Sequence, residues 1–171
     1  MLDYIVRRMA PSDWRRYREV RLRALQDDPD AFGTLYADVV DNPDEFWRAR
    51  LSNLSSDHDL PLFAEVGGEV VGLAWGRIER TDLHRAHLFQ MWVAPDHRAH
   101  GVGRALVDAV ASWSASRGAR SLELSVTCGN TAALRLYESA GFQPVGRPEP
   151  MRRDSELLEQ AMKRELDKGA R

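Results

Sequence analysis

The sequence predicts an α+β domain in which helices pack on a central sheet. The chain has 171 residues, about the length of one domain, and 43% of them are hydrophobic, enough to bury a core. Hydrophobic periodicity gives one strand, two helices, a run of strands, and then alternating strands and helices. Because no linker or internal repeat interrupts this order, we expect a single domain over residues 1–171.

The first third of the chain is predicted to hold one strand and two helices. Tyr4 to Met9 alternates as a strand does, and Ser12 is the predicted N-cap of the helix that follows. A polar connection leads to a second helix, with Asn42 as its cap and Pro43 as its first residue. The buried faces are predicted to carry Trp14, Tyr17, Val20 and Ala24 in the first helix, and Trp47 and Leu51 in the second.

The rest of the chain is predicted to alternate strands with two further helices. A glycine pair, Gly67-Gly68, marks a hairpin between two strands. The predicted strands are Leu62–Val66, Val70–Ile78, Leu88–Val93, Ser121–Val126, Phe142–Val145 and Glu159–Leu166. The predicted helices are Gly101–Arg117, with a buried stripe of Val102, Ala105, Leu106, Ala109, Val110 and Trp113, and a helix that Asn130 opens and Gly141 closes.

Composition excludes several classes of function. With 24 basic and 26 acidic residues the net charge is −2, which argues against a nucleic-acid partner. Cys128 is the single cysteine, so no internal disulfide and no thiolate zinc site can form, and we expect no bound metal. The N-terminus lacks the pattern of a signal peptide and no apolar run reaches the length of a membrane span. We therefore expect a cytoplasmic protein without membrane contact.

The segment from Phe89 to Leu106 carries the strongest signal of chemistry. A strand runs into a short loop, and the loop runs into a helix with Gly101 and Gly103 at its start. Helix N-termini expose unpaired N–H groups, and glycine lets a ligand approach them. With Arg98 and Arg104 this pattern predicts a cradle for a phosphate or pyrophosphate, although the glycines alone are equally typical of a tight turn. The spacing matches neither a Rossmann fingerprint nor a P-loop, which disfavours phosphoryl transfer.

Two motifs in this order resemble those of the GCN5-related N-acetyltransferases (GNAT family). Arg98-Ala-His-Gly101-Val-Gly103 matches the family signature R/Q-x-x-G-x-G/A, and the segment from Asn130 to Phe142 is similar to the N-x-x-A-x-x-x-Y-x-x-x-G-F helix. The resemblance covers nearly the whole chain. It implies an α/β/α sandwich with a mixed, mostly antiparallel sheet, splayed central strands and about four flanking helices. Family members are often dimers, so the resemblance also makes a homodimer a possible assembly.

The resemblance implies roles for individual residues. Acetyl-CoA is the implied acyl donor, with its pyrophosphate on the loop and its pantetheine arm beside the preceding strand. The implied cofactor-binding residues are Met91, Trp92, Val93, Arg98, Ala99, His100, Gly101, Val102, Gly103, Arg104 and Asn130. Tyr137 is the implied catalytic acid toward the leaving thiolate, and helical spacing places it on one face with Asn130 and Ala133. Phe32 and Gln90 are the expected contacts to the substrate.

The expected activity is transfer of an acetyl group from acetyl-CoA to a primary amine of a small molecule, by direct attack in a ternary complex. A protein N-terminal or lysine acetyltransferase and a non-catalytic acyl-CoA-binding module remain alternatives. The non-catalytic module remains an alternative because Phe89 and Gln90 occupy the positions at which many relatives carry a carboxylate base. Four other candidates for the base are interpreted as solvated loop residues: Glu79, Asp82, His84 and His87.

Two further features allow more than one interpretation. Cys128 is interpreted as a small buried residue, with a nucleophile as the alternative. Positions 27 to 45 hold seven acidic residues and no basic one. An acidic rim of this kind would attract cationic amines, but the pattern is also typical of an ordinary solvated surface.

Overall fold

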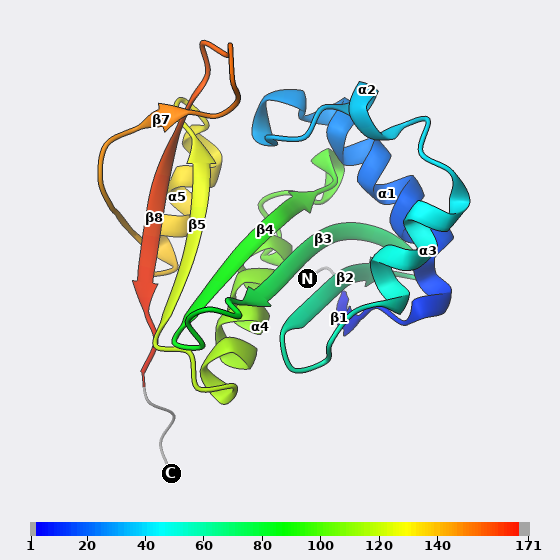
Figure 1. Ribbon diagram of the computed structural model, residues 1–171, viewed down its shortest axis with the longest axis horizontal. Coiled ribbons are helices and arrows are strands. Elements are labelled where there is room, and N and C mark those ends of the chain that lie inside the picture. The colour runs from blue at the N-terminus through cyan, green and yellow to red at the C-terminus, as the bar shows by residue number, and fades with distance from the viewer. Residues whose placement is uncertain (1–2, 168–171) are drawn as a thin grey trace.

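The computed structural model describes residues 3–167, which form one mixed sheet of eight strands with helices on both faces (Figure 1). The strand order is β1-β2-β3-β4-β5-β8-β6, with β7 paired to β8. Every pair is antiparallel except β4 with β5. The strands are β1 (Ile5–Arg8), β2 (Asp59–Val66), β3 (Glu69–Ile78), β4 (Arg85–Val93), β5 (Ser121–Thr127), β6 (Gln143–Pro144), β7 (Glu149–Pro150) and β8 (Leu158–Glu165).

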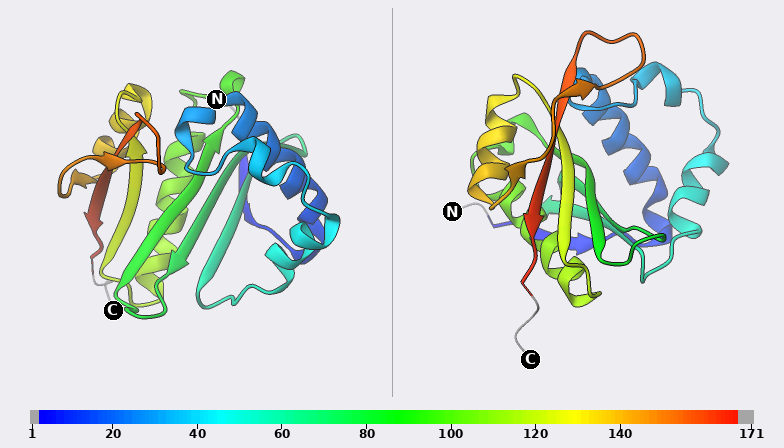
Figure 2. Two further views of the ribbon diagram at one scale, coloured as in Figure 1. Left: turned by 45° about the horizontal axis from the view of Figure 1, so that its top comes forward. Right: turned by 60° about the vertical axis from the view of Figure 1, so that its left-hand side comes forward.

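The helices divide between the two faces of the sheet (Figures 1 and 2). They are α1 (Trp14–Asp27), α2 (Tyr36–Val39), α3 (Asp44–Ser52), α4 (Val102–Ser116) and α5 (Thr131–Ser139). The pair α1 and α3 covers one face, and α4 and α5 lie side by side on the other. The structure thus confirms the α/β/α sandwich. Within the described residues α2 is a single turn, so four longer helices flank the sheet as expected.

The sheet opens between β4 and β5. Their parallel ladder joins only Arg85–His87 to Ser121–Glu123, after which the two strands diverge (Figure 1). A register shift against β3 also bends β4, because Gln90 and Met91 lie opposite the single residue Ala74. At this bulge Gln90 adopts a positive φ of 54°, which is unusual for a residue with a side chain. The expected splay of the central strands is confirmed, and it leaves one edge of β4 without a strand partner.

Two glycines of β3 let α4 lie close to the sheet. A Cβ at Gly76 would come within 2.8 Å of the Val110 side chain, and one at Gly72 within 3.0 Å of Leu106. The buried face of α4 is Val102, Leu106, Val107, Val110, Ala111 and Ser114. The predicted stripe was therefore partly wrong, since Trp113 is only half-buried and packs beside Gly76. The close approach fixes the position of α4 against β3.

Both predicted helix caps are wrong by a short distance. Ser12 lies inside a 3-10 turn, Pro11–Asp13, and it is the Asp13 carboxylate that accepts the Ala10 N–H, at 2.7 Å. The second long helix begins at Asp44 and not at Pro43, because Pro43 has an extended ψ of 162°. Asn42 consequently caps nothing: α3 has no side-chain hydrogen bond at its N-cap. These starts are set by tertiary contacts and proline geometry, which local sequence rules do not capture.

The structure also changes some strand and side-chain assignments. β2 and β4 begin three residues earlier than predicted, at Asp59 and Arg85, and the short pieces α2 and β7 were not foreseen. Cys128 is exposed, which corrects its interpretation as a buried residue. It follows the end of β5, where its N–H donates to the Leu158 carbonyl at 2.8 Å. Within residues 3–167 no helix combines the length and the apolar content needed to cross a bilayer.

Candidate active site

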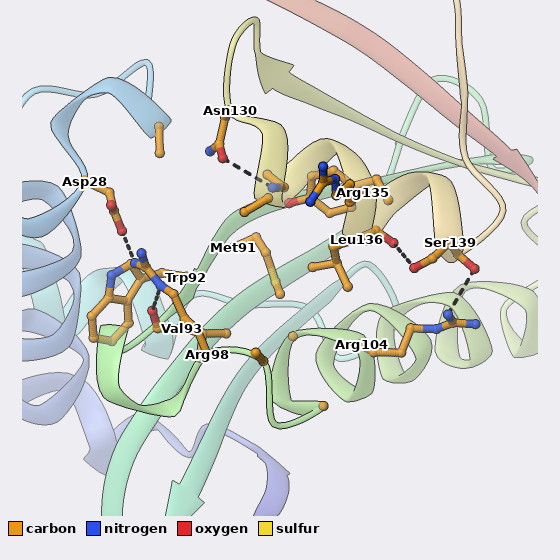
Figure 3. A pocket seen from close by; sticks show the side chains of 17 residues that line it. Asp28, Met91, Trp92, Val93, Arg98, Arg104, Asn130, Arg135, Leu136 and Ser139 are labelled. Carbon is orange, nitrogen blue, oxygen red and sulfur yellow. Dashed lines mark hydrogen bonds and ion pairs between the residues drawn. The ribbon is translucent and has the colours of Figure 1, made fainter.

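A large cavity of about 550 Å³ lies between the open edge of β4 and the first turns of α4 and α5 (Figure 3). Its volume is in the range of small-molecule sites. We call it the large cavity; it is lined by Asp28, Ala31, Met91, Trp92, Val93, Arg98, Ala99, Gly101, Gly103, Arg104, Asn130, Ala132, Ala133, Arg135, Leu136, Tyr137 and Ser139.

Most residues of the predicted cofactor site meet in this cavity. Those that line it are Met91, Trp92, Val93, Arg98, Ala99, Gly101, Gly103, Arg104 and Asn130, together with the predicted acid Tyr137. His100 is exposed outside it and Val102 is fully buried in the core. These two can therefore contribute their main chain but not their side chains.

The loop into α4 presents a row of free main-chain donors. Within the described residues, none of the N–H groups from Ala99 to Arg104 donates to a backbone carbonyl, and the first helical bond runs from Ala105 to Gly101. Ala99 and Gly101 have positive φ angles of 62° and 85°, which turn the chain into the helix. A Cβ at Gly103 would lie 3.1 Å from Leu136 and would intrude on the cavity wall. This loop fits an anion that binds to main-chain N–H groups.

The two arginines of the predicted cradle already have partners. Arg98 forms an ion pair with Asp28, and its Nε donates to the Val93 carbonyl at 2.9 Å (Figure 3). Arg104 bonds to Asp108 at 3.1 Å and to the Ser139 carbonyl at 3.0 Å. Arg135, which sequence reasoning missed, lines the same cavity from α5, is exposed, and forms no ion pair within the described residues.

The open edge of β4 offers further backbone groups. The Ala94 N–H donates to Val71 of β3, at 2.8 Å. Because backbone groups alternate along a strand, Met91 and Val93 direct theirs to the opposite edge, toward the cavity. The Arg98 side chain occupies the Val93 carbonyl, so this carbonyl is not available to a ligand. The N–H groups of both residues and the Met91 carbonyl remain for one.

Helix α5 forms the far wall of the large cavity. The Asn130 Oδ1 accepts the Ala133 N–H at 3.2 Å and caps the helix, which leaves the side-chain NH₂ for a ligand. Tyr137 is buried against Phe142, with ring centroids 5.9 Å apart. Burial raises the pKa of the Tyr137 hydroxyl well above its usual range, so it stays protonated at neutral pH. Leu136 lies on the same helix face, and the i, i+3 spacing from Ala133 was a signal that could have found it.

A small cavity of about 180 Å³ opens on the other side of β4. It is lined by Tyr17, Arg21, Thr34, Val39, Phe46, Trp47, Arg50 and Gln90, which come from α1, the α1–α3 connection, α3 and β4. Gln90 lines this small cavity, while its neighbour Met91 lines the large one. The bulge in β4 is thus shared by two cavities on opposite faces of the sheet. Tyr17 fixes Gln90 there by donating its hydroxyl to the Gln90 Oε1 at 2.8 Å.

Arg21 is the most unusual residue of the small cavity. Its relative exposure is 6%, and its Nη1 is buried without a hydrogen-bond partner. Burial lowers the pKa of the Arg21 guanidinium, and nearby Arg50 lowers it further. Arg21 stacks on Phe32 at 4.7 Å. Phe32, an expected substrate contact, lines neither cavity; it is buried in the core beneath this arginine.

The acidic residues of the α1–α3 region do not form the rim that would attract a cation. Asp27, Asp28 and Asp44 pair with Arg23, Arg98 and Arg18, respectively. None of the seven acidic residues lines the small cavity. The interpretation as ordinary solvated surface therefore fits this region better.

The four other candidates for a base lie away from both cavities. His87 bonds to Glu79 at 3.2 Å, beside Arg85 and Glu123 at the end of β4 where the sheet is closed. The hydrogen bond from His87 holds the pKa of Glu79 below its usual range. Asp82 and His84 lie in the β3–β4 turn. No group of three or more metal-ligating side chains occurs within residues 3–167.

Comparison with protein families gives one match over most of the chain. A family model described as the acetyltransferase (GNAT) family matches residues 13–142. An acetyltransferase from Pectobacterium atrosepticum is 35% identical over 92 residues, which are 54% of this chain. The match spans 63% of the length of that relative.

Solved structures share the whole architecture. A GNAT-family acetyltransferase from Streptococcus pneumoniae superposes with a TM-score of 0.81 at 22% identity, over 96% of this chain and 100% of the other. An acetyltransferase from Salmonella typhimurium, solved with its cofactor acetyl-CoA, gives a TM-score of 0.80 at 20% identity over 99% and 97%. At these identities the likeness establishes the fold.

Proposed function

The chain belongs to the acetyltransferase (GNAT) family, and from this premise we propose that it transfers an acetyl group from acetyl-CoA to a primary amine of a small molecule. One observation carries the proposal: the β4 bulge separates a large cavity with free main-chain donors from a small cavity on the opposite face. A donor and an acceptor that enter from opposite faces meet at Gln90 and Met91.

The large cavity suits two parts of acetyl-CoA, the pyrophosphate and the pantetheine arm. The free N–H groups from Ala99 to Arg104 bind the pyrophosphate, and Gly103 leaves room for it. The pantetheine arm lies along β4, where Met91 and Val93 supply main-chain groups in place of a missing strand. An amide carbonyl of the arm also accepts a hydrogen bond from the free NH₂ of Asn130. The relative from Salmonella typhimurium, which has the same fold and was solved with acetyl-CoA, supports this assignment.

In the proposed step acetyl-CoA supplies a thioester, whose carbonyl carbon is attacked by the amine nitrogen as the carbon–sulfur bond breaks. The Met91 N–H stabilises the carbonyl oxygen, which gains negative charge. Tyr137 hydrogen-bonds to the departing sulfur and gives it a proton. The nitrogen loses its own proton to water, and this proton returns to the Tyr137 oxygen, so that the products are the amide and the free thiol of CoA. No acidic side chain lines the small cavity, so the amine reacts from its neutral fraction, about one in a few thousand at pH 7 for an amine of pKa about 10.4.

The test is an acceptor screen. The purified protein is mixed with acetyl-CoA and a panel of small amines, a peptide with a free N-terminus and a lysine peptide, and CoA release is followed by thiol detection with product mass as confirmation. We expect release above background hydrolysis with at least one small amine. Acetyl-CoA binding by calorimetry without release for any amine would make the protein a non-catalytic module, and release with the peptides alone would contradict the small-molecule acceptor.

A further inference from the structure

We propose that the small cavity selects an acceptor amine that also carries a carboxylate group, and that Arg21 and Arg50 recognise this group. The inference rests on the proposed acyl transfer and adds to it the chemical class of the acceptor. Amino acids and related small amino carboxylates are members of this class.

Arg21 is the first observation behind the proposal. A guanidinium inside a protein is normally paired, because burying an unpaired charge costs free energy. Arg21 is 94% buried, since its relative exposure is 6%, yet it has no carboxylate partner within the described residues. Its Nη1 is buried without any hydrogen-bond partner within the described residues, and the residue lines the small cavity. An anion that enters the cavity would therefore supply the partner that the charge and the donors of this side chain lack.

Arg50 is the second and independent observation. It lines the same cavity from α3, where its guanidinium lies over the Trp75 ring at 5.6 Å. It too forms no ion pair within residues 3–167. Both guanidinium groups belong to the lining of one cavity, and the positive charge of Arg50 lowers the pKa of Arg21. An anion between them removes both the repulsion and the unpaired donors.

The remaining walls fit a small amino carboxylate and exclude a cationic polyamine. Among the residues that the structure describes, no acidic one lines the cavity, and the other polar side chains there are uncharged: Tyr17, Thr34, Trp47 and Gln90. A guanidinium matches a carboxylate in a bidentate pair, which gives direction as well as charge. With the carboxylate on the arginines, the free amine of the acceptor is directed to Gln90 and the β4 bulge, where the acetyl donor lies.

The decisive experiment compares acceptors in which the carboxylate is present or is replaced by a neutral amide, with kcat/KM expressed per neutral amine. Free L-amino acids and their C-terminal amides are assayed as pairs by CoA release. For the wild-type protein we expect kcat/KM to be at least tenfold higher for the free acid of the best pair. For Arg21→Met and Arg50→Met we expect this ratio to fall at least tenfold, through a higher KM for the acid.

Three controls separate recognition from structure. Arg48→Met removes a charge from the same helix, but Arg48 is exposed and stacks on Trp14 outside the cavity, so the acid-to-amide ratio should not change. Arg21→Lys keeps the charge and should restore part of the preference. The thermal midpoint of Arg21→Met without ligand should equal or exceed that of the wild type, because an unpaired buried charge has been removed.

The outcomes are distinct for the inference and for the proposed function. Acetylation of amines with no acid preference, or an undiminished preference in both methionine variants, overturns the inference and leaves the acetyltransferase intact. If the preference for phosphoethanolamine over ethanolamine exceeds the preference for acids over amides, the recognised group is a phosphate and not a carboxylate, which overturns the inference. If no amine is acetylated, binding of N-acetyl amino acids and their amides in the presence of CoA, followed by thermal shift, still tests the pocket. A shift with the acid that Arg21→Met abolishes supports the inference, and equal shifts contradict it.

Discussion

At the scale of single residues, the anion-binding capacity of the large cavity depends on a residue without a side chain and on arginines that are already paired with carboxylates. Arg98 and Arg104 carry the charges that the sequence pattern assigns to a phosphate, but Asp28 and Asp108 neutralise them. The proposed anion site consequently rests on main-chain N–H groups, which a ligand can reach only if no side chain covers them. Gly103 is the residue that keeps them open, because any side chain there meets Leu136 and the cavity.

Gly103→Trp should raise the KM for acetyl-CoA at least tenfold or abolish binding, because the indole fills the space in front of the loop. Steady-state kinetics and calorimetry measure the effect. Ser112→Trp is the matched control, since it adds the same ring to an exposed position of the same helix. Circular dichroism should show both variants folded. Unchanged binding in Gly103→Trp would refute the assignment of the pyrophosphate to this loop.

Tyr137→Phe should lower kcat at least tenfold and change the affinity for acetyl-CoA less than threefold. The variant keeps the ring contact with Phe142 and removes only the hydroxyl. Because the raised pKa keeps this hydroxyl protonated, the wild-type kcat should show no alkaline decline from Tyr137 below about pH 10. Full kcat in the variant would exclude Tyr137 as the proton donor.

At the scale of elements, the ends of helices and strands are set by contacts between distant segments. Asp13 shows this at the start of α1. Its carboxylate accepts two hydrogen bonds from Arg7 of β1, at 2.8 and 3.0 Å, and a third from the Ala10 N–H. The hydrogen bonds from Arg7 lower the pKa of Asp13 below its usual value. The pair thus fastens the first helix to the edge of the sheet.

Asp13→Asn should lower the free energy of unfolding at pH 7 by about 1–2 kcal/mol, the usual size for charge-assisted hydrogen bonds. A lowered folded-state pKa stabilises the protein above about pH 4 and loses this effect as the pH falls through the folded value. Urea unfolding at pH 7 and pH 3 should therefore show a smaller difference at pH 3. Asp44→Asn, which breaks an exposed pair with Arg18, is the control and should cost about 0.5 kcal/mol or less. Equal losses in the two variants would contradict this role.

Local sequence signals predicted most of the helices and strands and most of the residues that line the large cavity. Periodicity and turn glycines are local, so the hairpin around Gly67-Gly68 and the helices α4 and α5 were predicted close to their observed bounds. The two motifs placed most of the large cavity. The small cavity was not predicted, because Arg21, Arg50 and Gln90 come from three separate elements and no short pattern links them. For the same reason the ion pair between Arg98 and Asp28, which are 70 residues apart, could not be predicted from the sequence.

At the scale of the whole molecule, the two parts of the sheet are joined weakly. Strands β1 to β4 and strands β5 to β8 share a ladder of only three residue pairs. The α1–α2 connection adds a bridge across the gap, where the Thr127 hydroxyl donates to the Asp30 carbonyl at 2.6 Å. We expect residues 1–171 to act as one domain because these parts share one core; the homodimer stays a prediction from the resemblance.

Acetyl-CoA should stabilise the whole molecule because it contacts both parts of the sheet. At a concentration about 100 times its Kd, a ligand that binds only the folded state adds about 2.7 kcal/mol. For a chain of this length that amounts to a rise of about 5–10 °C in Tm, which scanning calorimetry can measure. Gly103→Trp should lose this rise. A wild-type Tm that does not respond to saturating acetyl-CoA would count against binding in the gap.

The divergence of β4 from β5 also bears on how the protein is handled. A strand edge without a neighbour is a template on which a second chain can pair, and such edges favour aggregation. The ladder between β4 and β5 ends at His87, and in the binding mode proposed above the pantetheine arm covers the edge of β4 beyond it. We therefore expect coenzyme A, added during purification and storage, to protect the preparation from precipitation as well as from heat.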